Sequence, residues 1–138
     1  MSRTVEQRRA AYAFAFIGRQ QNSNSVDQKI EKDVQVNEKL STHIHKSPTL
    51  ILQCGLGQAL AFLCAEAAGN KSKPAMLLYQ FLQEWLCGIH EERYPMRVYS
   101  DIDLMNALLN GSRSEYFRAQ EESLRLFDWL KKFAAAKL

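Results

Sequence analysis

The sequence of 138 residues has few of the residues that interrupt regular structure or cross-link a chain. It holds three prolines and six glycines, which is too few for an all-β fold with a turn every ~8–12 residues. Its three cysteines, Cys54, Cys64 and Cys87, are an odd number and include no CxxC pair. These features argue against a disulfide framework, and we expect reduced, mostly buried thiols of a cytoplasmic protein.

Long hydrophobic runs and a strong net charge are also missing. No stretch approaches the ~20 apolar residues that span a membrane, and the start of the chain lacks the cleavage region of a secretory signal. The 18 Lys and Arg against 15 Asp and Glu leave a net charge of +3, and 46% of residues are hydrophobic. This balance excludes a disordered or tail-like basic protein and predicts one soluble domain over residues 1–138.

Apolar residues recur at helical spacing along most of the chain. This pattern predicts an all-α fold, a compact single-domain bundle of five to six helices. A capping box of Thr4 and Gln7 should begin the first helix, which should end near Gln20. A surface helix should then begin at residue 25 or 27 and end at Pro48, because the residue before a proline avoids helical angles.

The helices expected after Pro48 differ in character from those before it. The segment 49–68 carries no charge until Glu66 and is apolar nearly all round, so we expect one helix buried at the centre of the fold. A loop with Pro74 should follow it. Further helices are expected over 75–86, after a cap of Ser100 with Asp103, and from Ser112 or Ser114 to the end of the chain.

Candidate metal and catalytic groups are incomplete. His43 and His45 are two residues apart, which on a helix points them about 200° from each other. Cys87 and His90 have the spacing of half a zinc site, but the second half is missing. The chain also has no Gly-x-Ser-x-Gly motif. We therefore expect no enzyme, no cofactor and no metal.

Gly55-Leu56-Gly57 resembles the start of a phosphate-binding loop, but it lacks the Lys-Ser/Thr that completes one. Two interpretations are open. The glycines allow a neighbouring helix to approach closely or restart the helix, or their amides lie against a phosphate or an RNA backbone.

The first helix is basic, and no acidic residue follows Glu6 within it. Unpaired arginines beside the ring of Tyr12 would suit single-stranded RNA, which needs phosphate neutralisation and a stacking surface. Ordinary surface arginines are the alternative. The arginines in question are Arg3, Arg8, Arg9 and Arg19.

The last helix carries a second set of cations. Arg118, Arg125 and Lys132 are spaced by seven residues and form one stripe. Glu121 and Asp128 each precede one of these cations by four residues, a spacing that stabilises a helix through ion pairs. The stripe is thus either a contact surface for an anionic partner or a solvent-exposed face stabilised by ion pairs within the helix.

Three segments of the sequence resemble one known family. Residues 48–63, PTLILQCGLGQALAFL, are similar to the signature of the small subunit of type III-B CRISPR effectors, the Cmr complex. Residues 3–10, RTVEQRRA, resemble the amino terminus of that family. YFRAQEE at 116–122 and WLKKFA at 129–134 resemble its closing helix, so the matches span nearly the whole chain in family order.

The resemblance implies an all-helical, non-catalytic subunit of an RNA-guided antiviral complex in the cytoplasm. In the family, copies stack beside the backbone subunits, line the channel where target RNA pairs with the CRISPR RNA, and leave cleavage to the backbone and large subunits. The implied partners are those subunits, neighbouring copies of the chain itself, CRISPR RNA and target RNA, with no membrane.

On this interpretation the basic residues neutralise RNA phosphates rather than read bases. The alternative is a helical adaptor that contacts only protein, in which Phe117 and Trp129 serve neighbouring subunits. The expected RNA-binding residues are Arg8, Arg9, Arg19, Lys46, Arg118, Arg125 and Lys132.

Overall fold

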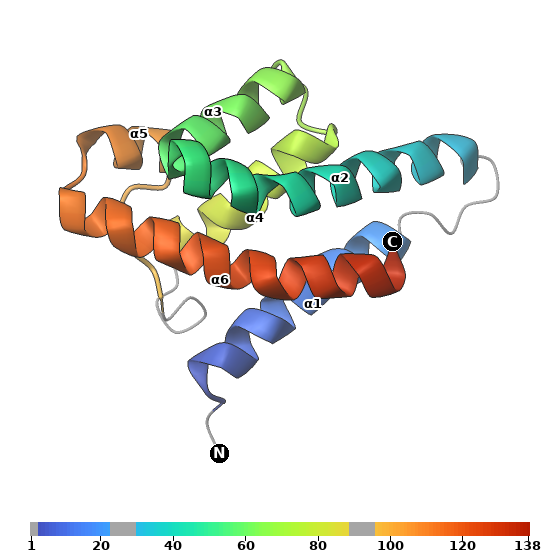
Figure 1. The fold of residues 1–138 in the computed structure, drawn as a ribbon, viewed down its shortest axis with the longest axis horizontal. Helices are drawn as coiled ribbons and strands as arrows, with labels where there is room; N and C mark the ends of the chain where they lie inside the picture. Colours follow the sequence, from blue (N-terminus) through green and yellow to red (C-terminus); the bar gives the residue numbers. More distant parts are fainter. Residues whose placement is uncertain (1–2, 23–29, 89–95) are drawn as a thin grey trace.

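The computed structural model describes residues 3–22, 30–88 and 96–138. Within these ranges the chain forms six helices and no strand (Figure 1). The predicted all-α fold is confirmed. No helix in these ranges is long and apolar enough to cross a bilayer. The helices are α1 (Val5–Asn22), α2 (Ile30–Cys54), α3 (Leu56–Ala67), α4 (Pro74–Cys87), α5 (Leu104–Asn110) and α6 (Arg113–Lys137).

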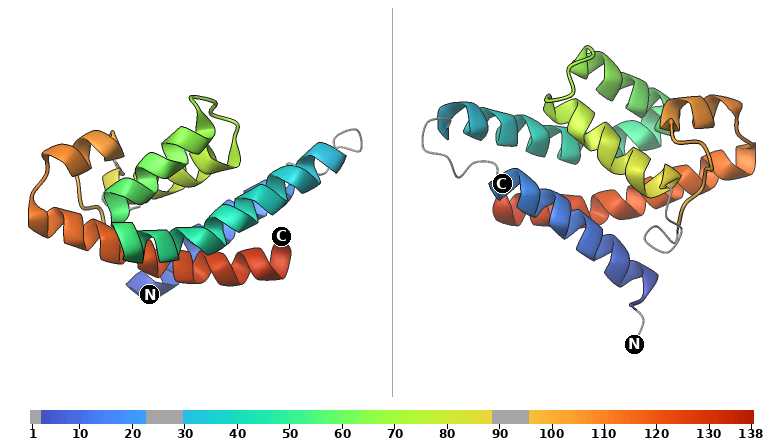
Figure 2. Two further views of the ribbon diagram at one scale, coloured as in Figure 1. Left: turned by 45° about the horizontal axis from the view of Figure 1, so that its top comes forward. Right: turned by 180° about the vertical axis from the view of Figure 1, so that it is seen from behind.

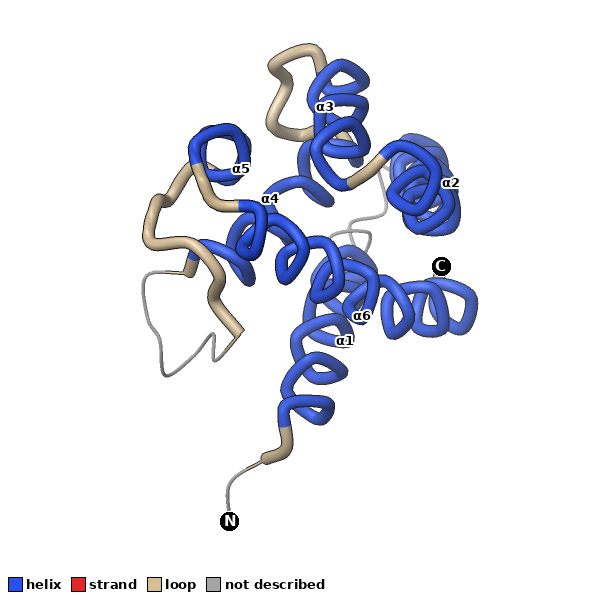
Figure 3. Tube along the Cα trace, turned by 60° about the vertical axis from the view of Figure 1, so that its left-hand side comes forward, coloured by secondary structure: helices blue, strands red, loops and turns tan. Residues whose placement is uncertain are grey.

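The helices pack around α4. The long helices α1 and α2 both lie against α6, and α3 packs on α2 and on α4 (Figures 1 and 2). Helix α4 contacts each of the other helices, and Figure 3 shows it near the middle of them. Its buried side chains include Trp85 and Leu82. The centre of the fold is therefore α4, and the prediction that segment 49–68 holds this place is wrong.

Local caps set several helix ends as predicted. The Thr4 amide donates to Gln7 Oε1 at 2.8 Å, and the Gln7 amide donates to Thr4 Oγ1 at 3.1 Å. A second capping box joins Ser112 and Glu115 at the start of α6. These two boxes satisfy amides that a helix start otherwise leaves unpaired.

The cap predicted for α5 is wrong. Asp103, not Ser100, precedes this helix, and its carboxylate accepts from the Asn106 amide at 3.4 Å. Asp101 closes the turn before it, because its carboxylate accepts from the Asp103 amide at 3.0 Å and from the Asn106 side chain at 2.8 Å. The helix therefore begins three residues later than the Ser100 cap implies.

Pro48 does not end α2, contrary to the prediction. The helix continues to Cys54 with Pro48 inside it. A proline inside a helix costs ~3 kcal/mol, whereas burying one large aliphatic side chain contributes ~1.5–3 kcal/mol. Ile44 and Ile51, one on each side of Pro48, are both buried. Keeping both in one buried stripe offsets the cost of the missing amide donor.

The segment 49–68 is not one helix, because Gly55 separates α2 from α3. Its φ of 88° lies in the left-handed region, where a side chain is strained. Burial on all sides is also wrong: Leu56 and Leu60 are buried, but Leu52 and Phe62 are exposed. The break turns α3 away from the direction of α2 (Figure 2).

The three thiols are free but not equally buried. Cys87 is buried, Cys64 is half-buried and Cys54 is exposed. The expectation of mostly buried thiols is therefore wrong for Cys54, which stands at the last position of α2, just before the break at Gly55.

Candidate functional site

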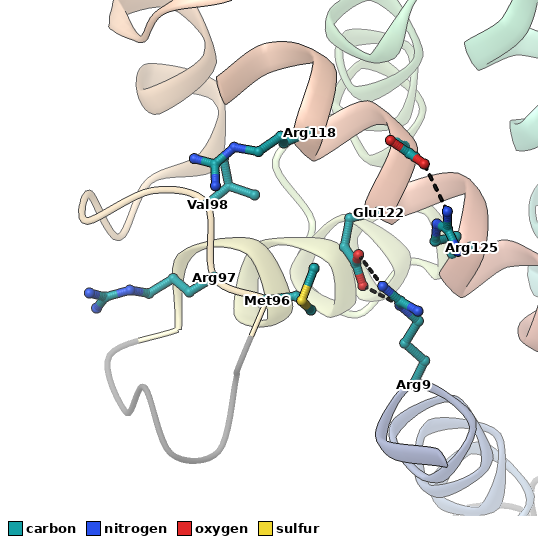
Figure 4. A pocket seen from close by; sticks show the side chains of 8 residues that line it. Arg9, Met96, Arg97, Val98, Arg118, Glu122 and Arg125 are labelled. Carbon is teal, nitrogen blue, oxygen red and sulfur yellow. Dashed lines mark hydrogen bonds and ion pairs between the residues drawn. The ribbon is translucent and has the colours of Figure 1, made fainter. Parts of the chain in front are cut away.

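A cleft of about 450 Å³ lies between α1, α6 and the segment 96–98 (Figure 4). It brings together three of the seven cations predicted from sequence: Arg9, Arg118 and Arg125. It adds one arginine that the sequence did not point to, Arg97. Four arginines thus line the cleft with two glutamates. The lining residues are Arg9, Met96, Arg97, Val98, Arg118, Glu121, Glu122 and Arg125.

Helix α6 provides half of this lining because of its periodicity. Positions 118, 121, 122 and 125 are three, four and seven apart, so their side chains share one flank of the helix. The neighbouring flank holds Ala119, Leu126 and Phe127, which are fully buried. Packing of this apolar flank fixes the rotation of α6 and so directs the charged flank toward the cleft.

The deepest group in the cleft is the ion pair of Arg9 with Glu122. Arg9 Nε lies 2.6 Å from Glu122 Oε1 and Nη2 lies 2.8 Å from Oε2, so the contact is bidentate. The indole N–H of Trp85 also donates to Glu122 Oε1 at 2.9 Å. Both charged residues are buried, and the hydrogen bonds to Glu122 raise the pKa of Arg9.

A second carboxylate extends this network toward the surface. Arg9 Nη1 donates to Glu6 Oε2 at 2.6 Å, and Trp129 Nε1 donates to Glu6 Oε1 at 2.8 Å. The bond from Trp129 lowers the pKa of Glu6, and the single bond from Arg9 and the charge of Arg9 lower it further. The expectation that the arginines of the first helix are unpaired is therefore wrong for Arg9, whose guanidinium is held between two carboxylates.

The other two cations from α6 differ in how they are held. Arg125 Nη2 lies 2.8 Å from Glu121 Oε1, and this bond raises the pKa of Arg125. Of the two ion pairs predicted from a spacing of four residues, that of Glu121 with Arg125 is confirmed, at the exposed surface. The pair of Asp128 with Lys132 is wrong, because Asp128 makes no ion pair with the described residues. Arg118 is exposed and makes no hydrogen bond or ion pair with the residues that the structure describes. Arg118 therefore presents its guanidinium to the cleft.

Arg97 is the residue that sequence reasoning missed. The amides of Val98 and Tyr99 donate to the Leu86 carbonyl at 2.8 and 3.0 Å, which anchors this segment on α4. Arg97 Nη1 donates to the Gly88 carbonyl at 3.2 Å, and the side chain points to the same side of the cleft as Arg118 (Figure 4). No periodicity marks a residue outside the helices, so only the folded chain relates Arg97 to α6.

The remaining predicted cations lie outside the residues that line the cleft. Arg8 is half-buried on α1, and Arg19 is exposed in the last turn of that helix. Lys46 is exposed on α2. Lys132 is exposed on α6, and its Nζ lies over the face of the Trp129 ring, 5.6 Å from the ring centre. These four cations do not gather at one place with the arginines of the cleft.

Tyr12 is not a stacking surface for RNA. Its ring lies 4.5 Å from the ring of Phe81 at an angle of 15°, and 4.8 Å from that of Trp85. Its hydroxyl donates to the Phe81 carbonyl at 2.6 Å. The ring therefore joins α1 to α4 within the bundle, and the expectation drawn from its place beside the arginines is wrong.

The amides of Leu56 and Gly57 bind side chains of α6. The Leu56 amide donates to Gln120 Oε1 and the Gly57 amide donates to the Tyr116 hydroxyl, each at 2.9 Å. A Cβ at Gly55 would lie 2.9 Å from that hydroxyl. The interpretation that the glycines restart the helix and admit a neighbour is confirmed. The alternative, a phosphate on these amides, is wrong because the donors are occupied.

His43 and His45, which were considered as metal ligands, lie beside an aromatic ring and a backbone carbonyl, respectively. The ring of His43 lies 6.4 Å from that of Phe62, and burial lowers its pKa. His45 Nδ1 lies 2.7 Å from the Ser41 carbonyl. His90 lies outside the described residues. Among the described residues, no three His, Cys, Asp or Glu side chains are grouped so that they could hold a metal.

Within the described residues, the fold and the cleft define a small all-α protein with a concave surface that is lined by arginines. The sequence model of the family described as CRISPR-associated protein (Cas_Cmr5) matches residues 5–137. The chain therefore belongs to this family, and the predicted resemblance is confirmed. Membership makes it a small subunit of the Cmr, type III-B CRISPR complex, with other components of that complex as partners.

Proposed function

We propose that this chain is a non-catalytic subunit of the type III-B ribonucleoprotein that contacts the phosphate backbone of target or guide RNA. In this role it stacks with neighbouring copies beside the backbone and large subunits, in the cytoplasm. Family membership supports the assembly. The observation that supports RNA contact is the cleft, where four arginines face two glutamates and one arginine, Arg118, makes no hydrogen bond or ion pair with the described residues.

The predicted contact residues fall into two groups on structural grounds. Arg118 and Arg125 line the cleft from one helix, and Arg97 joins them from the segment beside it. A guanidinium has five donors and can hold a phosphate in a bidentate contact. Arg9 belongs to the second group: its donors are engaged by Glu122 and Glu6, so we assign it to holding α1 on α6.

The cations outside the cleft stay in the proposal as additional phosphate contacts. Arg19 and Lys46 are exposed, and Lys132 continues the stripe of Arg118 and Arg125 along α6. From position 118 to position 132 the stripe extends about 21 Å along the helix axis. Such a length suits the backbone of an RNA strand rather than a single small anion. Arg8 completes the proposed set.

The test is retention of target RNA by the reconstituted complex carrying Arg118→Gln together with Arg125→Gln. We expect weaker retention and a salt dependence that decreases by about one unit of slope per lost phosphate contact. Arg113→Gln is the matched control, because Arg113 lies on the same helix but over the Phe117 ring and outside the cleft. Unchanged retention across a salt series would remove the cleft from the RNA path.

A second candidate function, a protein-only adaptor, rests on a different surface. Ile102, Leu109 and Phe117 are exposed around α5 and the first turns of α6. Exposed apolar side chains of this size are typical of protein contacts. Crosslinking of the assembled complex to labelled RNA separates the two functions, because an adaptor yields no RNA-linked peptide from α6.

A further inference from the structure

Two neighbouring glutamates on α6 hold two arginines of the cleft in opposite ways. Glu122 and Arg9 have side chains that are 4% and 7% exposed, and their contact is bidentate. Glu121 and Arg125 have side chains that are 67% and 50% exposed, and one hydrogen bond of 2.8 Å joins them. Breaking a buried pair leaves an uncompensated charge, whereas an exposed pair is weak and readily exchanged. Of these two arginines, only Arg125 can therefore exchange its glutamate for another anion.

We propose that Glu121 is an internal competitor for phosphate in the cleft. On RNA binding, a backbone phosphate displaces the Glu121 carboxylate from Arg125, and Arg118 binds a phosphate of the same strand. This proposal rests on the proposed function, because it names how the same surface engages and limits its RNA. It assigns Glu121, which the family resemblance did not single out, a role that opposes binding.

The geometry supports an exchange rather than a permanent pair. Arg118 and Arg125 are two turns apart, about 10.5 Å along the helix, and Glu121 lies between them on the same flank. An RNA strand whose phosphates bind both arginines would therefore pass close to the Glu121 carboxylate. Since that side chain is two-thirds exposed, it has room to turn toward solvent. A phosphate also offers the guanidinium a bidentate contact, which Glu121 does not make.

The substitution Glu121→Gln should strengthen binding, because it removes both the competitor and its repulsion of the phosphate. The probes are a short fluorescein-labelled oligouridylate with the full chain, read by anisotropy, and labelled target RNA with the reconstituted complex. We expect affinity to rise about two- to fivefold, the size of one exposed ion pair. Circular dichroism should show unchanged helicity, since the replaced side chain is exposed.

Asp128→Asn is the matched control for net charge. Asp128 is exposed on the same helix, lies outside the cleft lining, and makes no hydrogen bond or ion pair with the residues that the structure describes. Its replacement changes the charge by the same amount. We expect an increase in affinity well below that of Glu121→Gln, because Asp128 occupies no arginine or lysine of the stripe and its replacement removes only a nearby negative charge.

Arg125→Gln provides a second control through a double-mutant cycle. If Glu121 acts mainly by occupying Arg125, Glu121→Gln should raise affinity much less in the Arg125→Gln background than in the unsubstituted chain, because only the repulsion of the phosphate is left to remove. A full gain in the absence of Arg125 would overturn the proposal. Equal gains for Glu121→Gln and Asp128→Asn would also overturn it, because net charge alone would then explain them.

The remaining outcomes separate this proposal from the proposed function. If retention of RNA depends on Arg118 but Glu121→Gln changes nothing, only the competitor role fails. If neither the chain nor the complex responds to Arg118→Gln, RNA contact through the cleft fails, and this proposal fails with it. If Glu121→Gln strengthens the binding of another subunit instead of RNA, the cleft binds an acidic protein surface and the proposal is wrong.

Discussion

Arg9 and Glu122 lie 113 residues apart in the chain and form a buried, bidentate ion pair between α1 and α6. Trp85 of α4 donates to the same carboxylate, so one acidic group joins three helices. On its other side Arg9 reaches Glu6, which accepts from Trp129. This chain of hydrogen bonds sets where α1 crosses α6, and it thereby forms one wall of the arginine-lined cleft.

Removal of Glu122 should destabilise the fold strongly. Glu122→Ala leaves the buried Arg9 charge without its main partner, which costs about 3–5 kcal/mol of unfolding free energy. Urea unfolding followed by circular dichroism measures this. Glu121→Ala, one residue earlier on the exposed flank, is the control and should leave the midpoint nearly unchanged. A loss below about 1 kcal/mol for Glu122→Ala would show that the pair is not buried as described.

Alanine at the two glycines of the 55–57 turn should have opposite effects. Gly55→Ala places a Cβ at a φ of 88° and 2.9 Å from the Tyr116 hydroxyl, so it should destabilise the chain by at least about 1–2 kcal/mol. At Gly57 the same Cβ would meet that hydroxyl at 3.5 Å, an ordinary contact within α3. Gly57→Ala should therefore be neutral or stabilise by up to about 1 kcal/mol. Thermal unfolding of both variants provides the comparison, and equal losses would contradict it.

Tyr116→Phe should uncap one amide of α3 while leaving its neighbour protected. The substitution removes the hydroxyl that accepts from the Gly57 amide, at a cost of about 0.5–1.5 kcal/mol. Amide hydrogen exchange by NMR should become faster at Gly57. The Leu56 amide, which donates to Gln120, is the internal control and should keep its exchange rate. Faster exchange at both would indicate that the start of α3 unravels as a whole.

The three thiols should react at very different rates. Burial raises the pKa of Cys87 from its usual 9.0 to about 12 and also raises the pKa of Cys64, while Cys54 is exposed. With Ellman's reagent at about pH 8, Cys54 should react first and Cys87 only after unfolding, since the thiolate is the reactive form. Equal rates for Cys54 and Cys87 in the folded protein would contradict the burial of Cys87.

The raised pKa of Cys87 also predicts how stability depends on alkaline pH. The unfolded chain releases this proton near pH 9.0 and the folded chain only near 12. Below pH 9 the folded state loses nothing through this group, and between pH 9 and 12 its stability falls as pH rises. Tyr79 and Tyr99, whose pKa values burial raises from 10.0 to about 12, add to this decline above about pH 10. Cys87→Ala should make the fall in melting temperature across this range less steep.

The helices were predictable wherever their signals are local. The capping box of Thr4 with Gln7 lies within one turn of the chain, and so does that of Ser112 with Glu115. The ion pair of Glu121 with Arg125 likewise follows from a spacing of four residues. Each of these contacts needs only helical geometry, so a single sequence predicts it.

Predictions failed where packing in the folded chain, rather than the local sequence, determined where a helix ends or whether a ring is exposed. Pro48 has the local signature of a helix end, but burial of the residues around it keeps α2 intact. The helix break at Gly55 depends on Gln120 and Tyr116, which reach its amides from α6. Tyr12, read as a surface ring, is covered by Phe81. Gln120, Tyr116 and Phe81 all lie far along the sequence from the residues they contact.

The composition and periodicity of this sequence determined an all-α chain, most of its helix ends and the basic stripe on the last helix, and its motifs pointed to the family. The low content of proline, glycine and cysteine is part of that local information. Only the tertiary structure determined which cations line the same cleft. It buried Arg9 against Glu122, placed Arg97 beside α6 and left Arg118 facing the cleft. Helix formation depends on residues within about four positions, whereas charge pairing and the shape of a cleft depend on how whole helices pack.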